Sequence, residues 1–328
     1  MTILVTGVAG FVGSFVAAAL LARGEQVIGL DNVNSYYDVA LKQARLARLA
    51  PHPGFRFAKV DLADREAVSA ALAEANGGIT EVVHLAAQAG VRYSMIDPYA
   101  YVASNVMGHV VMLEAARRMP ALRHFVYASS SSVYGGNTSL PFRETDPVDL
   151  PVSLYAATKR ADELMGQAYS HLYALPQTGL RFFTVYGPWG RPDMAYYSFA
   201  RAIAAGTPIT LYDGGRLKRD FTYIDDIVQG ILGCLPHPPA AGERARLLNI
   251  GNHRAEEVLT LVRLLEEGLG RRAVVQDVPR PVADVEETFA DISAIRALAG
   301  FEPRTTLADG IPQFVAWFRD WHGVQPPA

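Results

Sequence analysis

Three glycines near the start of the chain limit its fold more than any other feature. An apolar run at residues 3–6 leads into the sequence TGVAGFVG, which spaces Gly7, Gly10 and Gly13 three residues apart before an apolar helical pattern. A tight turn requires Gly7, approach of the backbone to a pyrophosphate requires Gly10, and close packing of a helix on a sheet requires Gly13. Amides and the dipole at the helix N-terminus then attract phosphates. The segment therefore predicts a dinucleotide-binding turn.

Asp31 is the residue expected to select the dinucleotide. It ends the second predicted strand, 18 residues after Gly13, close to the spacing of an acid that binds the adenosine ribose. A carboxylate there accepts hydrogen bonds from the ribose hydroxyls and repels a 2′-phosphate, and no Lys or Arg follows before Lys42. We therefore predict NAD rather than NADP. Asp61 and Leu62 follow the third strand, where the adenine edge is expected.

The order of the predicted elements indicates a doubly wound parallel sheet. Short β-rich runs alternate with helical patterns in the first half of the chain, as in βαβ units with right-handed crossovers. The predicted strands cover residues 3–6, 26–31, 55–59, 81–85, 124–128 and 177–183, and the predicted helices cover residues 13–23, 41–49, 64–75, 101–119, 154–173, 197–205, 226–234, 256–268 and 307–321. We expect an α/β, Rossmann-type NAD-binding domain over residues 1–187. A smaller α/β substrate-binding lobe should cover residues 188–328, with some later segments returning to the sheet.

Composition excludes several classes of function. The chain has 328 residues, half of them hydrophobic, and a net charge of −3, so it can bury a large core but lacks the basic surplus of a nucleic-acid-binding protein. Cys234 is the single cysteine, which fits a reducing compartment. No charged leader precedes the first strand, and the apolar residues 11–22 are too few to span a bilayer. We expect a cytoplasmic protein that binds neither nucleic acid nor membranes, and we assign no metal site.

Tyr155 and Lys159 form the candidate catalytic pair. The sequence YAATK places them one helical turn apart on one face of a predicted helix. A tyrosine hydroxyl ordinarily loses its proton at about pH 10, but a neighbouring ammonium and an oxidised nicotinamide favour the phenolate. The pair would then act as a general base that removes a hydroxyl proton while a hydride leaves the carbon. Four serines at 129–132 follow an apolar strand, where a parallel sheet places ligand-binding groups.

The sequence resembles the extended short-chain dehydrogenases over nearly its whole length. The segments TGVAGFVG, HLAA, SSSSVYG and YAATK carry this resemblance. It implies that Tyr155 is the base, that Lys159 also binds the nicotinamide ribose, and that Ser130 assists the tyrosine. The resemblance and the motifs together predict these NAD-binding residues: Gly7, Gly10, Phe11, Val12, Gly13, Asp31, Asn32, Asn34, Ser35, Asp61, Leu62, Leu85, Ala86, Ala87, Asn105, Tyr155 and Lys159.

Further segments resemble the UDP-glucuronate 4-epimerases. These segments are DNVNSYYD at residues 31–38, AQAGVRYS at 87–94 and YGPWGRPDM at 186–194. A fourth segment, RDFTYIDD at 219–226, matches the nucleotide-sugar clamp of the wider family. The resemblance implies NAD-dependent 4-epimerisation of a UDP-sugar, with UDP-glucuronate converted to UDP-galacturonate through a 4-keto intermediate. Arginine suits both a diphosphate and a carboxylate, because it forms bidentate charge-assisted hydrogen bonds. The predicted substrate-binding residues are Arg92, Ser130, Ser131, Ser132, Thr184, Arg191, Arg219 and Arg280, although residues 279–284 lack the Gln-Pro-Gly-Asp run usual in this group.

Three other functions fit parts of the sequence. A UDP-glucose or UDP-N-acetylhexosamine 4-epimerase shares these motifs, although a neutral sugar gives Arg92 no obvious task. UDP-glucuronate decarboxylases usually carry Glu where Ser132 stands, and a hydroxyl does not replace that acid. A catalytically silent NAD-binding regulator would not need the intact catalytic residues. The predicted helices at 101–119 and 154–173 resemble the family's dimer-forming pair, so we expect a homodimer.

Overall fold

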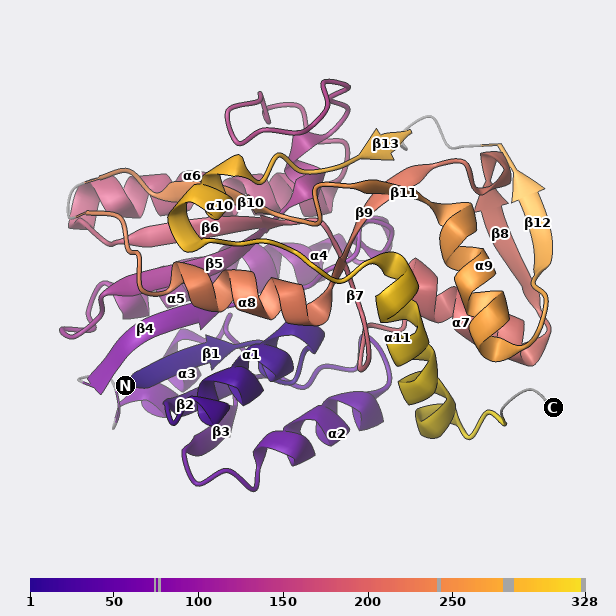
Figure 1. The fold of residues 1–328 in the computed structure, drawn as a ribbon. Coiled ribbons are helices and arrows are strands. Elements are labelled where there is room, and N and C mark those ends of the chain that lie inside the picture. Colours follow the sequence, from indigo (N-terminus) through magenta and orange to yellow (C-terminus); the bar gives the residue numbers. More distant parts are fainter. Residues whose placement is uncertain (74, 76–77, 241–242, 280–285, 326–328) are drawn as a thin grey trace.

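Seven parallel strands form the central sheet, in the spatial order β10-β6-β5-β4-β1-β2-β3 (Figure 1). The structure is a computed structural model, which describes every residue except 74, 76–77, 241–242, 280–285 and 326–328. The sheet strands are β1 (Thr2–Thr6), β2 (Gln26–Asp31), β3 (Phe55–Lys59), β4 (Ile79–His84), β5 (His124–Ser130), β6 (Gln177–Phe182) and β10 (Arg246–Ile250). The chain extends in opposite directions from β1, so the switch point lies between β1 and β4, where sheets of this kind bind ligands at the carboxyl ends of their strands.

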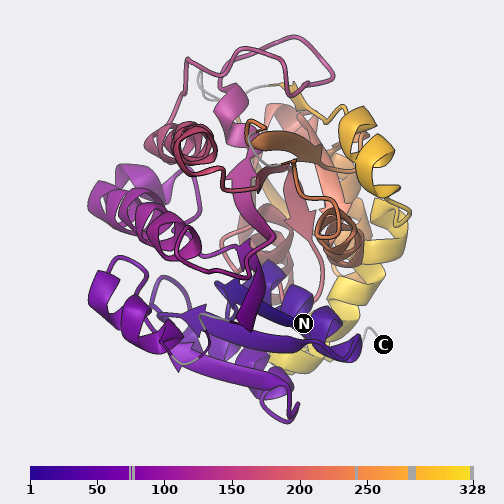
Figure 2. The same cartoon turned by 90° about the vertical axis from the view of Figure 1, so that its left-hand side faces the viewer.

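Helices cover both faces of this sheet, because successive strand residues point to opposite sides. Ile3 and Val5 pack in the core beneath α1 (Phe11–Ala22) and α8 (Ile224–Cys234). Leu4 packs on the other side with α3 (Arg65–Leu72) and α5 (Gly108–Ala116). Figure 2 shows the magenta helices on one side of the sheet and the orange and yellow helices on the other. The predicted Rossmann-type fold is confirmed.

The predicted helix at 101–119 is correct in position but not in regularity. It consists of α4 (Pro98–Tyr101), a π-helical turn at Val102–Met107, and then α5. Asp97 caps α4 by accepting a hydrogen bond from the Ala100 amide at 3.2 Å. A π-helical turn widens the helix by one residue and often occurs at functional sites. Hydrophobic periodicity alone does not distinguish such a turn from an ordinary α-helix.

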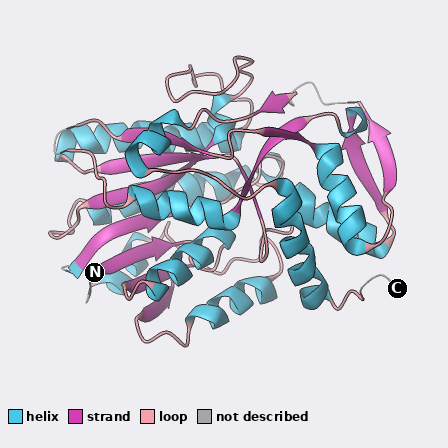
Figure 3. Cartoon of the chain, viewed as in Figure 1, coloured by secondary structure: helices cyan, strands magenta, loops and turns pink. Residues whose placement is uncertain are grey.

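Short strands and helices form a second lobe beside the carboxyl edge of the sheet (Figure 3). Its elements are β7 (Thr184–Tyr186), α7 (Ala195–Ala205), β8 (Pro208–Tyr212), β9 (Lys218–Tyr223), β11 (Ala255–Glu257), α9 (Val258–Leu269), β12 (Val274–Val278), β13 (Glu287–Thr288) and α11 (Leu307–His322). The chain also returns from this lobe, because β10 pairs with β6, α8 packs on α1, and α10 (Ser293–Ala299) packs on α8. In the described part of the chain, no helix has both the length and the apolar surface needed to cross a membrane.

Candidate active site

A cavity of about 430 Å³ opens at the carboxyl ends of the sheet strands, within the range of ~300–1,000 Å³ typical of small-molecule sites. It brings together the glycine turn, the ends of β2, β4 and β5, and the start of α6 (Leu154–Tyr173). The predicted residues that line it are Gly7, Gly10, Phe11, Val12, Gly13, Asp31, Asn32, Asn34, Asp61, Leu62, Leu85, Ala86, Ala87, Ser130, Ser131, Ser132, Tyr155, Lys159, Thr184 and Arg191. Among the described residues, no group of three or more His, Cys, Asp and Glu side chains is placed to hold a metal ion.

The three glycines provide the bare backbone that a dinucleotide pyrophosphate requires. Gly7 has a φ of +72°, and a Cβ there would lie 2.8 Å from the amide nitrogen of Ala86. A Cβ on Gly10 would lie 2.8 Å from the Gly7 carbonyl oxygen, and one on Gly13 would lie 2.1 Å from it. Helix α1 begins at Phe11, so the amides of its first turn border the same cavity. This turn fits the phosphates of NAD.

Asp31 provides a fixed carboxylate in the cavity wall. It ends β2, and only 8% of its surface is exposed. Its side chain accepts hydrogen bonds from the amides of Ala9 at 3.0 Å and Val33 at 2.7 Å. Burial raises the pKa of Asp31, whereas these two hydrogen bonds and the charges of Lys42 and Arg45 lower it. The carboxylate is therefore held where a bound adenosine ribose would meet it.

Selectivity for NAD follows from this carboxylate. We expect the purified chain to bind NAD at least ~10²-fold more tightly than NADP, because like charges brought together in a binding site cost several kcal/mol. Isothermal titration calorimetry of both dinucleotides measures the ratio. Asp31→Asn removes the charge and should bring the two affinities closer together. Comparable affinities for NAD and NADP in the unmodified chain would contradict this role of Asp31.

Two of the predicted NAD-binding residues, Ser35 and Asn105, lie outside the cavity wall. Asn105 is buried in the π-helical turn. Its amide donates to the Gln88 carbonyl at 3.0 Å and to the Thr158 hydroxyl at 2.9 Å, and its oxygen accepts from the Gln88 amide at 2.8 Å. Asn105 therefore ties the segment after β4 to α6, behind the cavity wall that Gln88 lines. Direct binding of NAD by Ser35 and Asn105 stays a prediction.

Tyr155 and Lys159 reach the cavity from the first turns of α6. Ser153 caps this helix by accepting a hydrogen bond from its backbone at 3.1 Å, which fixes where the helix begins. The Nζ of Lys159 donates to the Ala128 carbonyl at 2.9 Å and to the Asp162 carboxylate at 3.1 Å. An ammonium has three hydrogens, so these contacts leave one for a bound ligand. Burial raises the pKa of Asp162 to about 6, against the lowering effect of Lys159.

Ser130 ends β5, Ser131 and Ser132 follow it directly, and all three line the same cavity as the candidate catalytic pair. The Ser130 hydroxyl donates to the Ser132 hydroxyl at 3.1 Å and accepts a hydrogen bond from the Ser132 amide at 3.2 Å. Ser131 begins a short 3-10 turn that continues to Tyr134. This turn presents three successive hydroxyls beside Tyr155, so the site offers several hydrogen-bonding groups to a polar substrate.

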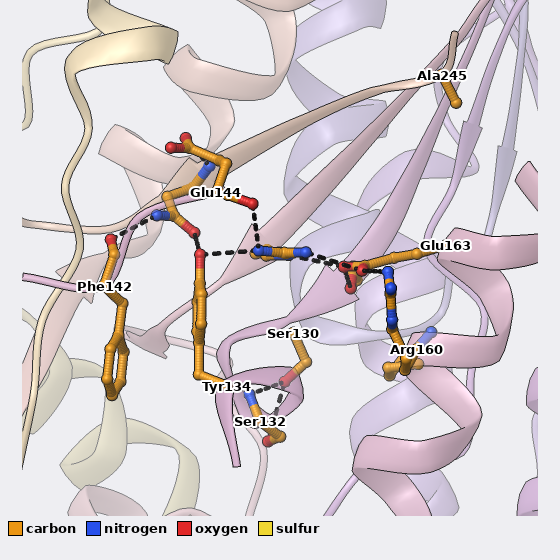
Figure 4. Close-up of polar contacts among 12 residues, drawn as sticks. Ser130, Ser132, Tyr134, Phe142, Glu144, Arg160, Glu163 and Ala245 are labelled. Atoms are coloured by element: carbon orange, nitrogen blue, oxygen red, sulfur yellow. Dashed lines mark hydrogen bonds and ion pairs between the residues drawn. The ribbon is translucent and has the colours of Figure 1, made fainter. Parts of the chain in front are cut away.

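A buried ion-pair network lies behind these side chains (Figure 4). Glu163 accepts two hydrogen bonds from Arg181, at 2.8 and 2.9 Å, one from the Ser129 hydroxyl at 2.6 Å and one from Arg160 at 3.1 Å. Arg181 also donates to the Tyr134 hydroxyl at 3.1 Å. The network holds α6 against β5 and β6, and no sequence motif predicted it. The sequence feature that could have indicated it is a set of charged residues at helical spacing, at 159, 162 and 163, which the structure places on the buried face of α6.

Arg191 is the predicted substrate arginine that lines the cavity. It forms an ion pair with Asp193, with N–O distances of 2.6 and 3.1 Å. The Tyr36 hydroxyl donates to the same carboxylate at 3.2 Å, so the pair joins the segment after β2 to the segment after β7. Thr184 begins β7 and also lines the cavity. These two predicted substrate residues lie in one cavity with Tyr155.

The other predicted arginines have different surroundings. Arg92 lies over the ring of Tyr212, at 5.6 Å from its centroid, and donates to its hydroxyl at 3.1 Å. Arg219 donates to backbone carbonyls of its own strand and of residue 286. Neither Arg92 nor Arg219 borders the cavity as the described residues form it. Arg280 lies outside the described residues.

Known proteins resemble the chain along nearly its full length. Residues 3–251 match the model of the NAD dependent epimerase/dehydratase family. The chain is 44% identical over 333 residues to a probable UDP-glucuronate 4-epimerase of Rhizobium meliloti (strain 1021), covering 97% of each chain. It is 47% identical over 344 residues to UDP-glucuronate 4-epimerase 1 of Arabidopsis thaliana, covering 100% of this chain and 79% of that protein.

A solved structure also resembles this chain along nearly its full length. The crystal structure of UDP-glucuronic acid 4-epimerase from Bacillus cereus in complex with UDP-glucuronic acid and NAD superposes with a TM-score of 0.89 at 32% sequence identity. The alignment covers 98% of this chain and 100% of that one. The resemblance carried by the glycine turn, the serine segment and the YAATK motif is thereby confirmed, and the chain belongs to the NAD-dependent epimerase/dehydratase family of extended short-chain dehydrogenases.

Proposed function

We propose that this chain interconverts UDP-glucuronate and UDP-galacturonate by NAD-dependent epimerisation at C4 of the sugar. The observation that carries the proposal is one cavity that contains the glycine turn, Asp31, the Tyr155–Lys159 pair, three serine hydroxyls and Thr184. Relatives named UDP-glucuronate 4-epimerases over the full length of the chain support the same substrate, as does the Bacillus cereus complex with UDP-glucuronic acid and NAD.

The residues of the site divide the work of moving one proton and holding the sugar. Lys159 stabilises the phenolate form of Tyr155 and orients the nicotinamide ribose, and this phenolate takes the proton of the 4-hydroxyl and becomes a neutral phenol. NAD, when bound, would provide the acceptor and donor of the C4 hydride. Ser130 donates a hydrogen bond to the oxygen that becomes a carbonyl. For epimerisation, the cavity must then allow the 4-keto sugar to turn, so that its opposite face is presented to the nicotinamide. Tyr155 then returns the proton to the C4 oxygen.

The uronate carboxylate needs its own hydrogen-bond partners. A 4-ketouronate is a β-keto acid, so the site must hold the carboxylate in an orientation that does not favour loss of carbon dioxide. Ser131, Ser132 and Thr184 line the cavity and can donate to it. Arg92 contacts Tyr212 and does not border the cavity as the described residues form it, so its role toward a charged sugar stays a prediction.

The experiment that tests this function offers the purified chain a panel of UDP-sugars and identifies the products by NMR. UDP-glucuronate should give UDP-galacturonate with little UDP-pentose, because Ser132 stands where decarboxylases have an acid. A UDP-pentose as the main product, with release of carbon dioxide, would make the chain a decarboxylase. Turnover of UDP-glucose at the same efficiency would make it a neutral-sugar epimerase.

We also propose that the chain is a homodimer, joined through the face formed by α4, the π-helical turn and α6. This face carries large apolar side chains that are well exposed in the single chain, namely Tyr99 (84%), Val102 (48%), Met107 (52%), Leu164 (54%) and Leu172 (64%). Exposed apolar patches of this kind mark association surfaces. A cytoplasmic location is proposed on the ground that Cys234, the single cysteine, is free and buried.

Light scattering of the purified chain should give twice the 35.6 kDa mass of one chain. Met107→Asp places a charge on the proposed dimer face and should shift the mass toward that of the monomer. Val274→Asp is the matched control, because Val274 is equally exposed (51% against 52%) but lies on β12 of the second lobe. A monomer in the unmodified chain, or equal effects of both variants, would contradict the proposed face.

A further inference from the structure

The guanidinium of Arg45 is fully buried and connects two distant parts of the molecule. Arg45 lies on α2 (Val39–Leu49), and none of its surface is exposed. A guanidinium has five N–H donors, and Arg45 makes two hydrogen bonds to the Trp189 carbonyl, one each to the carbonyls of Ala9 and Gly190, and one to a tyrosine hydroxyl. Every donor is therefore satisfied, and the planar fork is fixed in one orientation.

The two parts that Arg45 joins belong to the two halves of the cavity wall. Ala9 lies in the glycine turn, and its amide donates to Asp31, so Asp31 and Arg45 hold this residue from both sides. On the other side, Gly190 precedes Arg191, which lines the cavity. One side chain thus links the turn that fits the NAD phosphates to the segment that carries a predicted substrate arginine.

The linked segment has a backbone that needs external support. Trp189 has a φ of +62°, in the left-handed region that residues other than glycine rarely adopt. Such conformations are strained and persist only where the surroundings impose them. Two hydrogen bonds from Arg45 to the Trp189 carbonyl provide this support. The position of residues 189–191 therefore depends on where the Arg45 guanidinium lies.

The charge of Arg45 connects this arrangement to the cofactor. The five hydrogen bonds of Arg45 end on four uncharged oxygen atoms, whereas buried charges in proteins are normally paired. Arg45 lowers the pKa of Asp31, although burial of Asp31 raises it more, so the two groups share one electrostatic environment. A dinucleotide pyrophosphate in the adjacent glycine turn adds negative charge near the guanidinium, which has no carboxylate among its hydrogen-bond partners.

We propose that Arg45 is a positioning residue that couples NAD binding to UDP-sugar binding. NAD in the glycine turn stabilises the Arg45 guanidinium, and through it residues 189–191, in the arrangement that binds the nucleotide sugar. The proposal rests on the proposed function, which requires both ligands in one cavity. Because coupling between two binding equilibria is reciprocal, UDP-glucuronate must raise the affinity for NAD by the same factor.

The fold provides a spectroscopic reporter for this segment. The chain has three tryptophans, and all of them meet at residue 189, where the Trp189 ring lies 5.4 Å from Trp317 and 5.5 Å from Trp321. Emission excited at 295 nm therefore reports on the environment of residues 189–191. Adding NAD to the NAD-free chain should shift this emission before any sugar is present.

The test measures the Kd of NAD by calorimetry, without and with saturating UDP-glucuronate, in a Tyr155→Phe background that prevents turnover. In this background, UDP-glucuronate should tighten NAD binding about 5- to 150-fold, the usual range for coupled sites. Arg45→Met should bring the ratio of the two Kd values to within about twofold of unity. Arg45→Lys should do the same while it keeps the charge, because an ammonium cannot span both segments as the fork does.

Arg48→Met is the matched control. Arg48 lies on the same helix and packs over the Trp189 ring at 4.9 Å, but it donates no hydrogen bond to the 189–190 backbone among the described contacts. This variant should keep both the coupling ratio and the NAD-induced emission shift. Damage to the fold alone would weaken both Kd values together and leave their ratio unchanged, so the ratio separates positioning from stability.

Three results would overturn the proposal. The first is a coupling ratio in Arg45→Met or Arg45→Lys that stays within about twofold of the background value. The second is a loss of coupling in Arg48→Met equal to that in the Arg45 variants. The third is the absence of coupling in the Tyr155→Phe background itself. The last result needs no Arg45 variant, so it decides the question even if both variants fail to fold. Absence of any heat of binding for UDP-glucuronate would instead count against the proposed function.

Discussion

UDP-glucuronate should be converted with a kcat/KM on the order of 10⁴-fold higher than that of UDP-glucose. A site that hydrogen-bonds a buried charged group leaves its own polar groups unpaired when a neutral analogue binds, and discrimination on this basis reaches about 10⁴–10⁵. Ser131, Ser132 and Thr184 provide those polar groups here. An apolar pocket that merely sensed the size of the group at C5 would give only about 10- to 200-fold. Initial rates on the two UDP-sugars distinguish these magnitudes.

Thr184→Val sharpens this test, because it removes a hydroxyl and keeps the shape of the side chain. The variant should lower kcat/KM for UDP-glucuronate by at least ~10-fold, the cost of leaving a charged group without one hydrogen bond. It should leave the low rate on UDP-glucose nearly unchanged, because that sugar has no carboxylate to bind. Equal losses on both sugars would mean that Thr184 serves a part of the substrate that the two share.

The parts of the site near the glycine turn could be predicted because local sequence determines their geometry. Gly7, Gly10 and Gly13 each occupy a position where a Cβ would meet backbone atoms closer than 3.0 Å. The spacing of these residues therefore records a local steric requirement. Tyr155 and Lys159 lie one turn apart on a single helix, so their proximity also follows from sequence.

Residues that depend on distant segments were less predictable. Arg92 seemed a substrate residue from its motif, but its nearest described partner is Tyr212, 120 positions later. The hydrogen bonds of Arg45 to Trp189 likewise bridge 144 positions. Strand β12 was missed because nearly all of its residues are exposed, which removes the inside–outside alternation that identifies a strand. Such features follow from tertiary packing, which a single sequence does not display.

The buried polar face of α6 shows how pattern and packing can disagree. An amphipathic helix normally turns apolar residues to the core, but α6 buries Lys159, Asp162 and Glu163. Each of these finds a partner on another element or one turn away: Ala128 for Lys159, Lys159 for Asp162, and Arg181 and Ser129 for Glu163. The charges are tolerated because the network satisfies them. Together they hold α6, which carries Tyr155 and Lys159, at a fixed position on the sheet.

Tyr155→Phe should lower turnover of UDP-glucuronate by at least ~10²-fold, as expected for the loss of a positioned general base. Binding of NAD and UDP-glucuronate should persist, because the ring remains and only the hydroxyl is lost. Calorimetry measures binding, and NMR of the sugar products measures turnover. The loss should appear in kcat rather than in the affinity for either ligand, since proton removal takes place only in the reaction itself.

Tyr101→Phe is the matched control for this variant. The Tyr101 ring meets the Tyr155 ring edge to face at 6.0 Å, and its hydroxyl donates to the Ala89 carbonyl at 3.0 Å rather than to a ligand. Removing that hydroxyl should lower stability by about 0.5–1.5 kcal/mol and leave turnover within about tenfold of the unmodified chain. Such a result would show that loss of a hydroxyl from this aromatic pair is not sufficient to stop the reaction. Near-normal turnover in Tyr155→Phe would remove Tyr155 from the mechanism, and the proton would have to pass through Ser130 or another hydroxyl of the serine turn.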